Sequence, residues 1–289
     1  MLTKNGCYEQ KGYFCFMKFF KIVFNFYINV SAHVGLAVYA FVRITEHYMG
    51  LSNNETLNYF IFFGTITGYN FVKYAGVAKL HHKSLTNNLK IIQIFSFICF
   101  LAMCYFGAQI QLKTLLYAMP FVVLTFLYAV PFLSGFDKSL RQISYLKIIV
   151  VAIVWAGFTV LIPWVEAGEE ISLKLLLLLL QRFLIVMVLT LPFDIRDVRY
   201  DAISLQTIPK KIGIEKTKRL GLGLMIFALL IEYGINAIDS SKNVFMIFFF
   251  ASLVFLMRSK INQSKFYSSF WVESLPVIWG LLLLGIHSI

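Results

Sequence analysis

Apolar residues run through this chain in long unbroken stretches rather than in alternation with polar ones. Short polar segments separate nine such stretches, and the shortest is 243–257; the others cover 19–43, 57–78, 89–110, 114–134, 147–165, 172–193, 220–238 and 268–288. A helix of about 20 apolar residues crosses the hydrocarbon core of a bilayer. Lipid admits only helices and closed barrels, and barrel strands alternate. The pattern therefore predicts an all-α polytopic membrane protein with nine transmembrane helices.

Composition supports this class. The chain is 59% hydrophobic and 14% charged, whereas a soluble domain carries roughly 25% charged residues. We expect one transmembrane domain over residues 19–289. Residues 1–18 are expected to be a cytoplasmic tail, and because Met17 opens the segment MKFFKIVFNFYINV, its first 16 residues are interpreted as a tail or as an extension before the true start. The first apolar run is too long for a cleavable signal peptide, and the four cysteines lack metal-site spacing.

The net charge of +12 follows the topology rather than a nucleic-acid partner. Of the 26 Lys and Arg residues, 21 fall in the N-terminal segment and in every second loop after it. The opposite loops hold only Arg43, Lys113, Lys174 and Lys242. Cytoplasmic loops carry such an excess, so we expect the N-terminus in the cytoplasm, the C-terminus outside, and a location in a bacterial inner (plasma) membrane. Attraction to anionic lipid accounts for the basic excess, and no nucleic acid is implied.

Acids are scarce in this chain, yet three of them cluster in the most basic cytoplasmic loop. The stretch FDIRDVRYD places Asp194, Asp197 and Asp201 at i, i+3 and i+7, which share one helical face, while Arg196 and Arg199 are expected to project from the other side. Grouped carboxylates repel each other without a cation, and Mg²⁺ binds carboxylates together with substrate phosphates. The spacing suits a metal–diphosphate site at the membrane surface, against the plainer reading of a solvated loop with Asp194 as a helix cap.

The sequence around these acids resembles a known family. DIRDVRYDAISLQTIPKKIG is similar to the second aspartate-rich motif of the UbiA-type intramembrane prenyltransferases, and SYLKIIVVAIVWAG, which contains Lys147, resembles another stretch of that family. The resemblance implies a nine-helix bundle in which Mg²⁺, bound by Asp194, Asp197 and Asp201, grips the diphosphate of an isoprenyl donor. An acceptor within the membrane, aromatic or lipid, would then be alkylated.

The resemblance is incomplete at the end of the second apolar stretch. The family's first motif is Asn-x-x-x-Asp-x-x-x-Asp, and here Asn70 is kept while Tyr74 and Ala78 replace the aspartates. In one interpretation, positive charge replaces metal, and the diphosphate is bound by basic side chains together with one Mg²⁺ on the second motif. The candidates for direct substrate binding are Asn70, Lys73, Lys147 and Arg196, and further basic residues nearby are Lys79, His81, His82 and Lys83. In the other, the chain is a catalytically silent isoprenoid-binding homologue.

Three charges lie within predicted spans: Arg182, Glu232 and Glu273. Such residues are costly in lipid and are usually paired. We expect a buried Arg182–Glu232 or Arg182–Glu273 pair that stabilises the bundle. A small transporter built around these residues is the alternative from another functional class.

Overall fold

The computed structural model describes residues 18, 20–80, 87–130, 146–199, 207–235 and 239–287. Apart from Lys18, the expected tail over residues 1–18 lies outside this part. The described helices are Phe20–Asn29, α2 (Ala32–Met49), α3 (Glu55–Leu80), α4 (Asn87–Gly107), α5 (Leu112–Ala129), α6 (Leu146–Ala156), the π-helix η2 (Gly157–Leu161), α7 (Ile162–Glu166), α8 (Leu173–Asp197), α9 (Ile208–Ile212), α10 (Ile214–Ile235), α11 (Asp239–Arg258), the π-helix η3 (Tyr267–Val272) and α12 (Ser274–His287). No strand occurs within these ranges, which confirms the all-α prediction.

Each apolar stretch predicted from the sequence overlaps one or more of these helical segments. Within the described ranges, six helices are long and apolar enough to cross a membrane, or seven if the bent pair Phe20–Asn29 and Ala32–Met49 is one span. The polar positions of α3, such as Asn58 and Asn70, and the charged start of α10 keep these two helices out of that set. The integral membrane fold is therefore confirmed, and the count of nine crossings stays a prediction.

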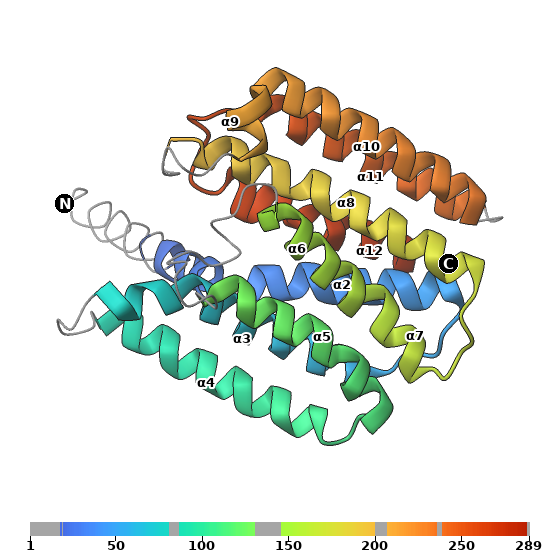
Figure 1. Ribbon diagram of the computed structural model, residues 1–289, viewed down its shortest axis with the longest axis horizontal. Coiled ribbons are helices and arrows are strands. Elements are labelled where there is room, and N and C mark those ends of the chain that lie inside the picture. Colours follow the sequence, from blue (N-terminus) through green and yellow to red (C-terminus); the bar gives the residue numbers. More distant parts are fainter. Residues whose placement is uncertain are drawn as a thin grey trace, which may run out of the picture.

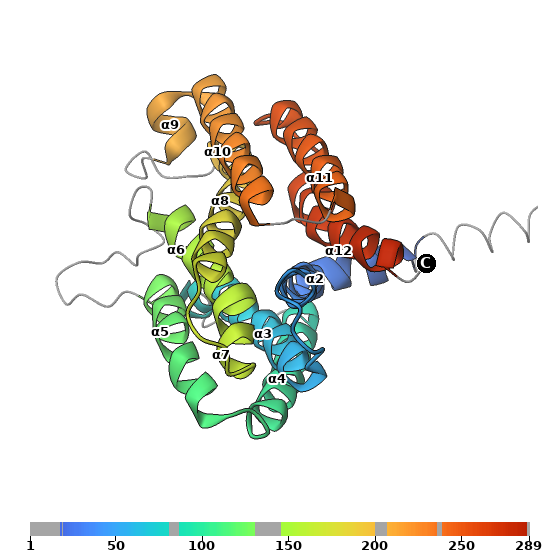
Figure 2. The same ribbon diagram turned by 90° about the vertical axis from the view of Figure 1, so that its right-hand side faces the viewer.

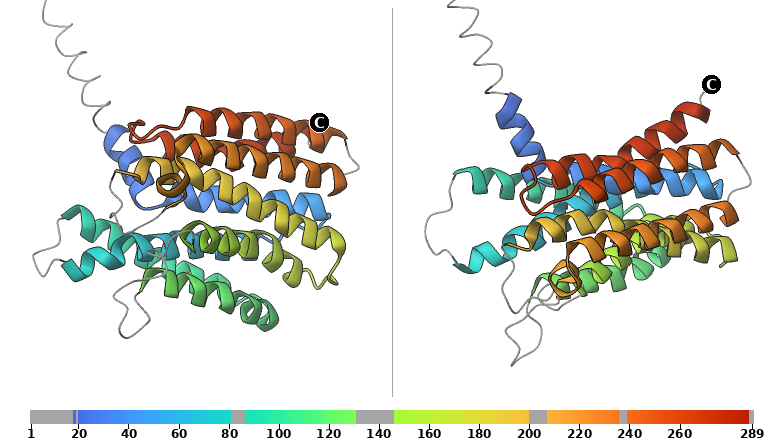
Figure 3. Two further views of the ribbon diagram at one scale, coloured as in Figure 1. Left: turned by 45° about the horizontal axis from the view of Figure 1, so that its top comes forward. Right: turned by 90° about the horizontal axis from the view of Figure 1, so that it is seen from above.

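The helices run side by side in one bundle (Figure 1). α2 packs against α3 and α12, and α8 packs against α6 and α10. Viewed after a quarter turn (Figure 2), α3, α4 and α5 lie on one side of the bundle and α10 and α11 on the other. α9 and the last turn of α8 stay at the same end of the bundle in both views of Figure 3. That end, which we call the α8 end, holds the acid cluster.

The first apolar stretch is broken, although the pattern predicts one continuous helix over 19–43. Helix Phe20–Asn29 and α2 meet at an angle of 61°, and Ser31 between them has a left-handed backbone with φ 59°. α2 then continues to Met49, where Gly50 adopts the left-handed conformation (φ 66°) that commonly ends helices. The break leaves carbonyl groups without helical partners, which is costly in lipid. Side chains of α3 satisfy them, as described below.

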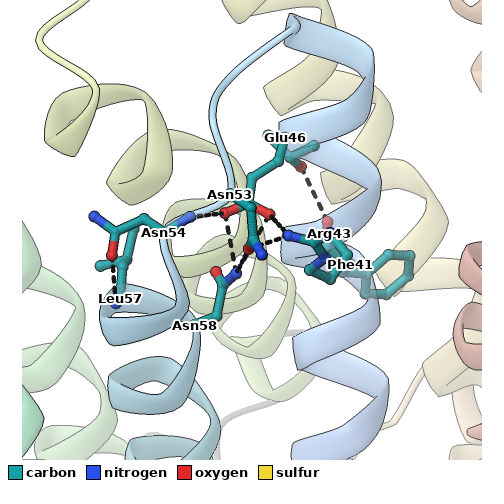
Figure 4. Close-up of polar contacts among 8 residues, drawn as sticks. Phe41, Arg43, Glu46, Asn53, Asn54, Leu57 and Asn58 are labelled. Carbon is teal, nitrogen blue, oxygen red and sulfur yellow. Dashed lines mark hydrogen bonds and ion pairs between the residues drawn. The ribbon is translucent and has the colours of Figure 1, made fainter. Parts of the chain in front are cut away.

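A buried acid holds the opposite end of α2 (Figure 4). The Glu46 carboxylate accepts hydrogen bonds from Arg43 Nη1 at 2.7 Å, from Asn58 Nδ2 at 3.0 Å and from the backbone N–H of Asn54 at 3.3 Å. Arg43 also contacts Asn53. With its charge satisfied from three directions, Glu46 fixes the turn between α2 and α3.

Arg182 is fully buried in the middle of α8. Its Nη1 donates to the carbonyl oxygen of Phe41 at 2.9 Å, and its Nη2 donates to Thr45 Oγ1 at 3.3 Å. The guanidinium carbon also lies 4.1 Å from the centre of the Phe41 ring. These contacts tie α8 to α2, as expected of a bundle-stabilising charge.

Glu232 of α10 belongs to the same cluster. Its carboxylate accepts from the Tyr48 hydroxyl at 2.9 Å and from Gln181 Nε2 at 2.7 Å, and it interacts electrostatically with Arg182. Arg182 and Glu232 therefore lie within electrostatic range of each other, while Glu273 lies near other cations at the α8 end. The full burial and multiple bonds of these two residues favour a structural role over a transport path.

Candidate functional site

Asp194 and Asp197 lie on the last turn of α8, which extends four residues past the apolar stretch that predicted it. Lys147, at the start of α6, places its Nζ 2.7 Å from Asp194 Oδ1 and 3.8 Å from Asp197 Oδ2. The Asp194 side chain is only 3% exposed. Two acids at a helix C-terminus oppose the helix dipole, and a buried carboxylate without a partner is strongly destabilising. The ammonium therefore supplies the cation that the predicted cluster requires.

Arg196 also belongs to this cluster, and its predicted projection away from the acids is wrong. Its Nε lies 2.8 Å from Asp197 Oδ1, and its guanidinium carbon lies 5.3 Å from the centre of the Phe193 ring. The long side chain folds back along the helix end because Asp197 is the nearest anion. Arg199 instead contacts Asn262. The described site thus places two carboxylates against two cations at the α8 end of the bundle.

The first aspartate motif was expected on α3. The α3 residues at that place form hydrogen bonds to carbonyl oxygens at the break in the first apolar stretch. Asn70 Nδ2 donates to the carbonyl oxygen of Val30 at 3.0 Å. Lys73 Nζ and the Tyr74 hydroxyl both donate to the carbonyl oxygen of Asn29 at 3.0 Å. These are the carbonyls freed by the helix break. Asn70 and Tyr74 therefore have a structural task, and Lys73 is tethered near the site while staying exposed.

Several predicted residues lie outside the described part of the chain. Asp201, His81, His82 and Lys83 fall in segments that the structure does not describe, and the side chains of Ala78 and Lys79 share that limit. Their proposed roles rest on the sequence alone.

Aromatic side chains lie deeper in the bundle than the charged cluster. Tyr69 precedes Lys73 by about one turn of α3, and its hydroxyl accepts a hydrogen bond from Trp155 Nε1 at 3.0 Å. Trp155 follows Lys147 by eight residues, which is about 12 Å along a helix. The Trp155 ring lies 6.0 Å from that of Phe41. An apolar tail that extends inward from the charged cluster would therefore meet aromatic surface.

Glu273 is a site candidate that the sequence pattern placed only as an intramembrane charge. It stands between η3 and α12, within electrostatic range of Lys73 and Arg196. The neighbouring Val272 and Leu275 are buried, at 1% and 3% exposed, whereas Glu273 is partly accessible. The signal available in the sequence was an acid near the start of an apolar span, but only tertiary contacts show which cations lie near it.

The described carboxylates fit part of a magnesium site. Among the described residues, no group of three or more His, Cys, Asp or Glu side chains is placed to hold a metal ion. Asp194 and Asp197 do converge on one cation, the Lys147 ammonium. Mg²⁺ commonly binds one or two carboxylates and completes its shell with substrate phosphates and water. The pair therefore fits one ion that is shared with a diphosphate.

Known proteins match this chain in sequence pattern and in fold. A structure of a UbiA homolog from Archaeoglobus fulgidus bound to DMAPP and Mg²⁺ is similar, with 12% identity, a TM-score of 0.61 and coverage of 91% of this chain and 99% of that one. The same homolog bound to GPP and Mg²⁺ gives 14% identity, a TM-score of 0.58 and coverage of 90% and 97%.

A structure described as digeranylgeranylglyceryl phosphate synthase in membranes gives 16% identity, a TM-score of 0.53 and coverage of 91% and 96%. At these identities the likeness concerns the fold alone. No curated protein matches the chain. The family model of the UbiA prenyltransferases matches residues 87–268, which is more than half of the sequence. This chain is therefore a member of the UbiA prenyltransferase family.

Proposed function

We propose that this protein transfers an isoprenyl group from an isoprenyl diphosphate to an acceptor held in the membrane, with Mg²⁺ as cofactor. The observation that carries the proposal is the pair Asp194 and Asp197, brought together around one cation at the end of α8 in a chain of this family. The two Archaeoglobus fulgidus neighbours bind an isoprenyl diphosphate and Mg²⁺, which supports the same ligands here.

The proposed roles of the residues at the α8 end follow from their charges. Asp194 and Asp197, with Asp201 from the adjoining segment, would hold Mg²⁺, which neutralises the leaving diphosphate. Lys147, Arg196 and Lys73 would contact phosphate oxygens, because Arg and Lys donate strong charge-assisted hydrogen bonds to phosphate. Asn70 would act by holding the helix break beside Lys73. Tyr69 and Trp155 would contact the isoprenyl chain.

Positive charge takes the place of the missing first-motif acids in this scheme. Two carboxylates of that motif are absent, and Lys73 lies in the same part of α3. The Lys73 ammonium would neutralise phosphate charge directly, without carboxylates to bind a second metal ion. One Mg²⁺ on the second motif would then be enough to hold the diphosphate. We further propose a single prenyltransferase-like domain over residues 19–289, with the N-terminus in the cytoplasm and the α8 end facing it, in a bacterial plasma membrane.

The test is diphosphate binding by the purified protein in lipid nanodiscs. We expect geranyl diphosphate to bind in a Mg²⁺-dependent manner, and Asp194→Ala or Asp197→Ala to abolish that dependence. Glu55→Gln, which changes an exposed acid at the start of α3, is the control and should bind as the parent does. Unchanged affinity in both aspartate variants would refute the site.

Catalysis is tested separately with radiolabelled isoprenyl diphosphates of several chain lengths in membranes that contain the protein. Lipid-soluble product and released diphosphate are expected, and both should require Mg²⁺. Binding without either outcome at every chain length identifies a silent isoprenoid-binding homologue instead.

A further inference from the structure

We propose that Glu273 is the base that accepts the proton lost by the acceptor when the isoprenyl group is transferred. This inference rests on the proposed transferase function and extends it to the acceptor. It also defines the acceptor class: a hydroxyl group, or an aromatic ring that carries a replaceable hydrogen.

The position of Glu273 is the first argument. Lys73 and Arg196, which would contact the diphosphate, both lie within electrostatic range of its carboxylate. The Tyr27 and Tyr69 hydroxyls also lie within electrostatic range of it. Glu273 is thus within electrostatic range both of cations of the charged cluster and of Tyr69, whose hydroxyl accepts a hydrogen bond from Trp155. In an allylic diphosphate the reacting carbon is one bond from the phosphate oxygen, so the new bond would form close to the cations that hold the diphosphate.

The accessibility of Glu273 is the second argument. Glu273 is partly accessible, as is Ser274 after it, whereas Val272 and Leu275 are buried. Among the described residues, no side chain forms a hydrogen bond with its carboxylate, whereas Glu46 and Glu232 each accept hydrogen bonds from two or more donors. A carboxylate that has no hydrogen-bond donor and only nearby cations keeps its oxygen atoms available to accept a proton.

The backbone around Glu273 is fixed by α2. His33 Nε2 lies 3.0 Å from the carbonyl oxygen of Phe270 and 3.1 Å from Ser274 Oγ, and its Nδ1 lies 2.8 Å from the Tyr27 hydroxyl. These contacts clamp the residues on either side of Glu273. The preceding turn is the π-helix η3, a form that often occurs at functional sites. A base needs such a fixed position relative to the atom that loses its proton.

The chemical step balances as follows. The bond between the allylic carbon and the phosphate oxygen breaks, and its electron pair leaves with the diphosphate. An electron pair of the acceptor forms the new bond to the allylic carbon. The acceptor's proton then passes to the Glu273 carboxylate, and from there to water at the cytoplasmic end. No oxidant or reductant takes part.

The experiment compares Glu273→Gln, Glu273→Asp and the control Glu55→Gln in membranes that contain the native acceptor. The probes are Mg²⁺, radiolabelled geranyl diphosphate for turnover and geranyl thiodiphosphate, a slowly reacting analogue, for binding. We expect Glu273→Gln to lower prenylated product about 100-fold or more, the range of general-base catalysis. Mg²⁺-dependent binding of the analogue should stay within twofold of the parent. Diphosphate release should then exceed product formation, because water captures the allylic group, and Glu273→Asp should recover part of the transfer.

Other outcomes separate this inference from the function beneath it. If the parent binds no geranyl thiodiphosphate with Mg²⁺, the proposed function itself fails. If the parent binds the analogue but forms no product, the chain is a silent homologue and Glu273 has no such role. Parental product formation by Glu273→Gln overturns the inference alone. Loss of binding in Glu273→Gln also overturns it, since the residue would then serve the diphosphate or the fold.

Discussion

Removing the Lys147 ammonium should lower the free energy of unfolding, because this cation pairs with two acids. Lys147 Nζ lies 2.7 Å from Asp194 Oδ1. At an effective dielectric constant of about 20, two unit charges at that distance attract by roughly 6 kcal/mol. Desolvation of the two charges offsets much of this attraction, but removing one partner of a buried pair typically costs about 3–5 kcal/mol because the other charge is left buried alone. Because the Lys147 side chain is 20% exposed, we take the lower end and expect about 3 kcal/mol for Lys147→Met.

The assay is thermal unfolding of the purified protein in detergent, followed by tryptophan fluorescence. At about 2 °C per kcal/mol for a chain of this size, Lys147→Met should unfold about 6 °C below the parent. The double variant Lys147→Met with Asp194→Asn removes both charges and should recover most of the loss, since replacing a whole buried pair is nearly neutral. A double variant as unstable as the sum of its single variants would refute the pairing.

Mg²⁺ provides a second readout from the same samples. If the ammonium occupies the position that the ion needs, Mg²⁺ should raise the unfolding temperature of Lys147→Met more than that of the parent. Mg²⁺ at 100 times its dissociation constant would raise the free energy of unfolding by about 2.7 kcal/mol. Equal shifts in the two proteins would show that Lys147 and Mg²⁺ do not compete.

Two further substitutions test the fold around the site. Tyr74→Phe removes the hydroxyl that donates to the carbonyl oxygen of Asn29, so it should lower the unfolding free energy by about 1 kcal/mol. Mg²⁺-dependent diphosphate binding should remain intact. A loss of that binding would instead make Tyr74 part of the site. In α10, a Cβ at Gly221 would lie 2.5 Å from Leu256 Cδ2 and 2.8 Å from Leu191 Cδ1, whereas one at Gly223 meets nothing within 4 Å. Gly221→Ala should therefore lower the unfolding free energy by about 1–3 kcal/mol through overpacking, whereas Gly223→Ala should be neutral or stabilising. Equal unfolding temperatures for the two variants would contradict the packing of α10 against α8 and α11.

The site was predictable where it depended on local spacing. The i, i+3 relation of Asp194 and Asp197 fixes a common helical face, and both carboxylates do face Lys147. The direction of Arg196 was not predictable in this way, because a long flexible side chain follows the nearest anion rather than the helical position of its Cα atom. The apolar pattern did not predict the break at Ser31, because apolar residues continue on both sides of it.

The sequence by itself determined that this is an all-α membrane protein, because lipid leaves the backbone almost no other solution for long apolar runs. It also placed the acid cluster at the end of an apolar stretch, and the spacing of the acids put them on one helical face. Only the tertiary structure decided what those acids face. Lys147 comes from α6 and the Asp194–Asp197 pair from α8. Asn70, Lys73 and Tyr74 are directed at the carbonyls of a helix break far away in the chain. Charge pairing between distant segments depends on which helix ends meet, and that is set by packing rather than by local pattern.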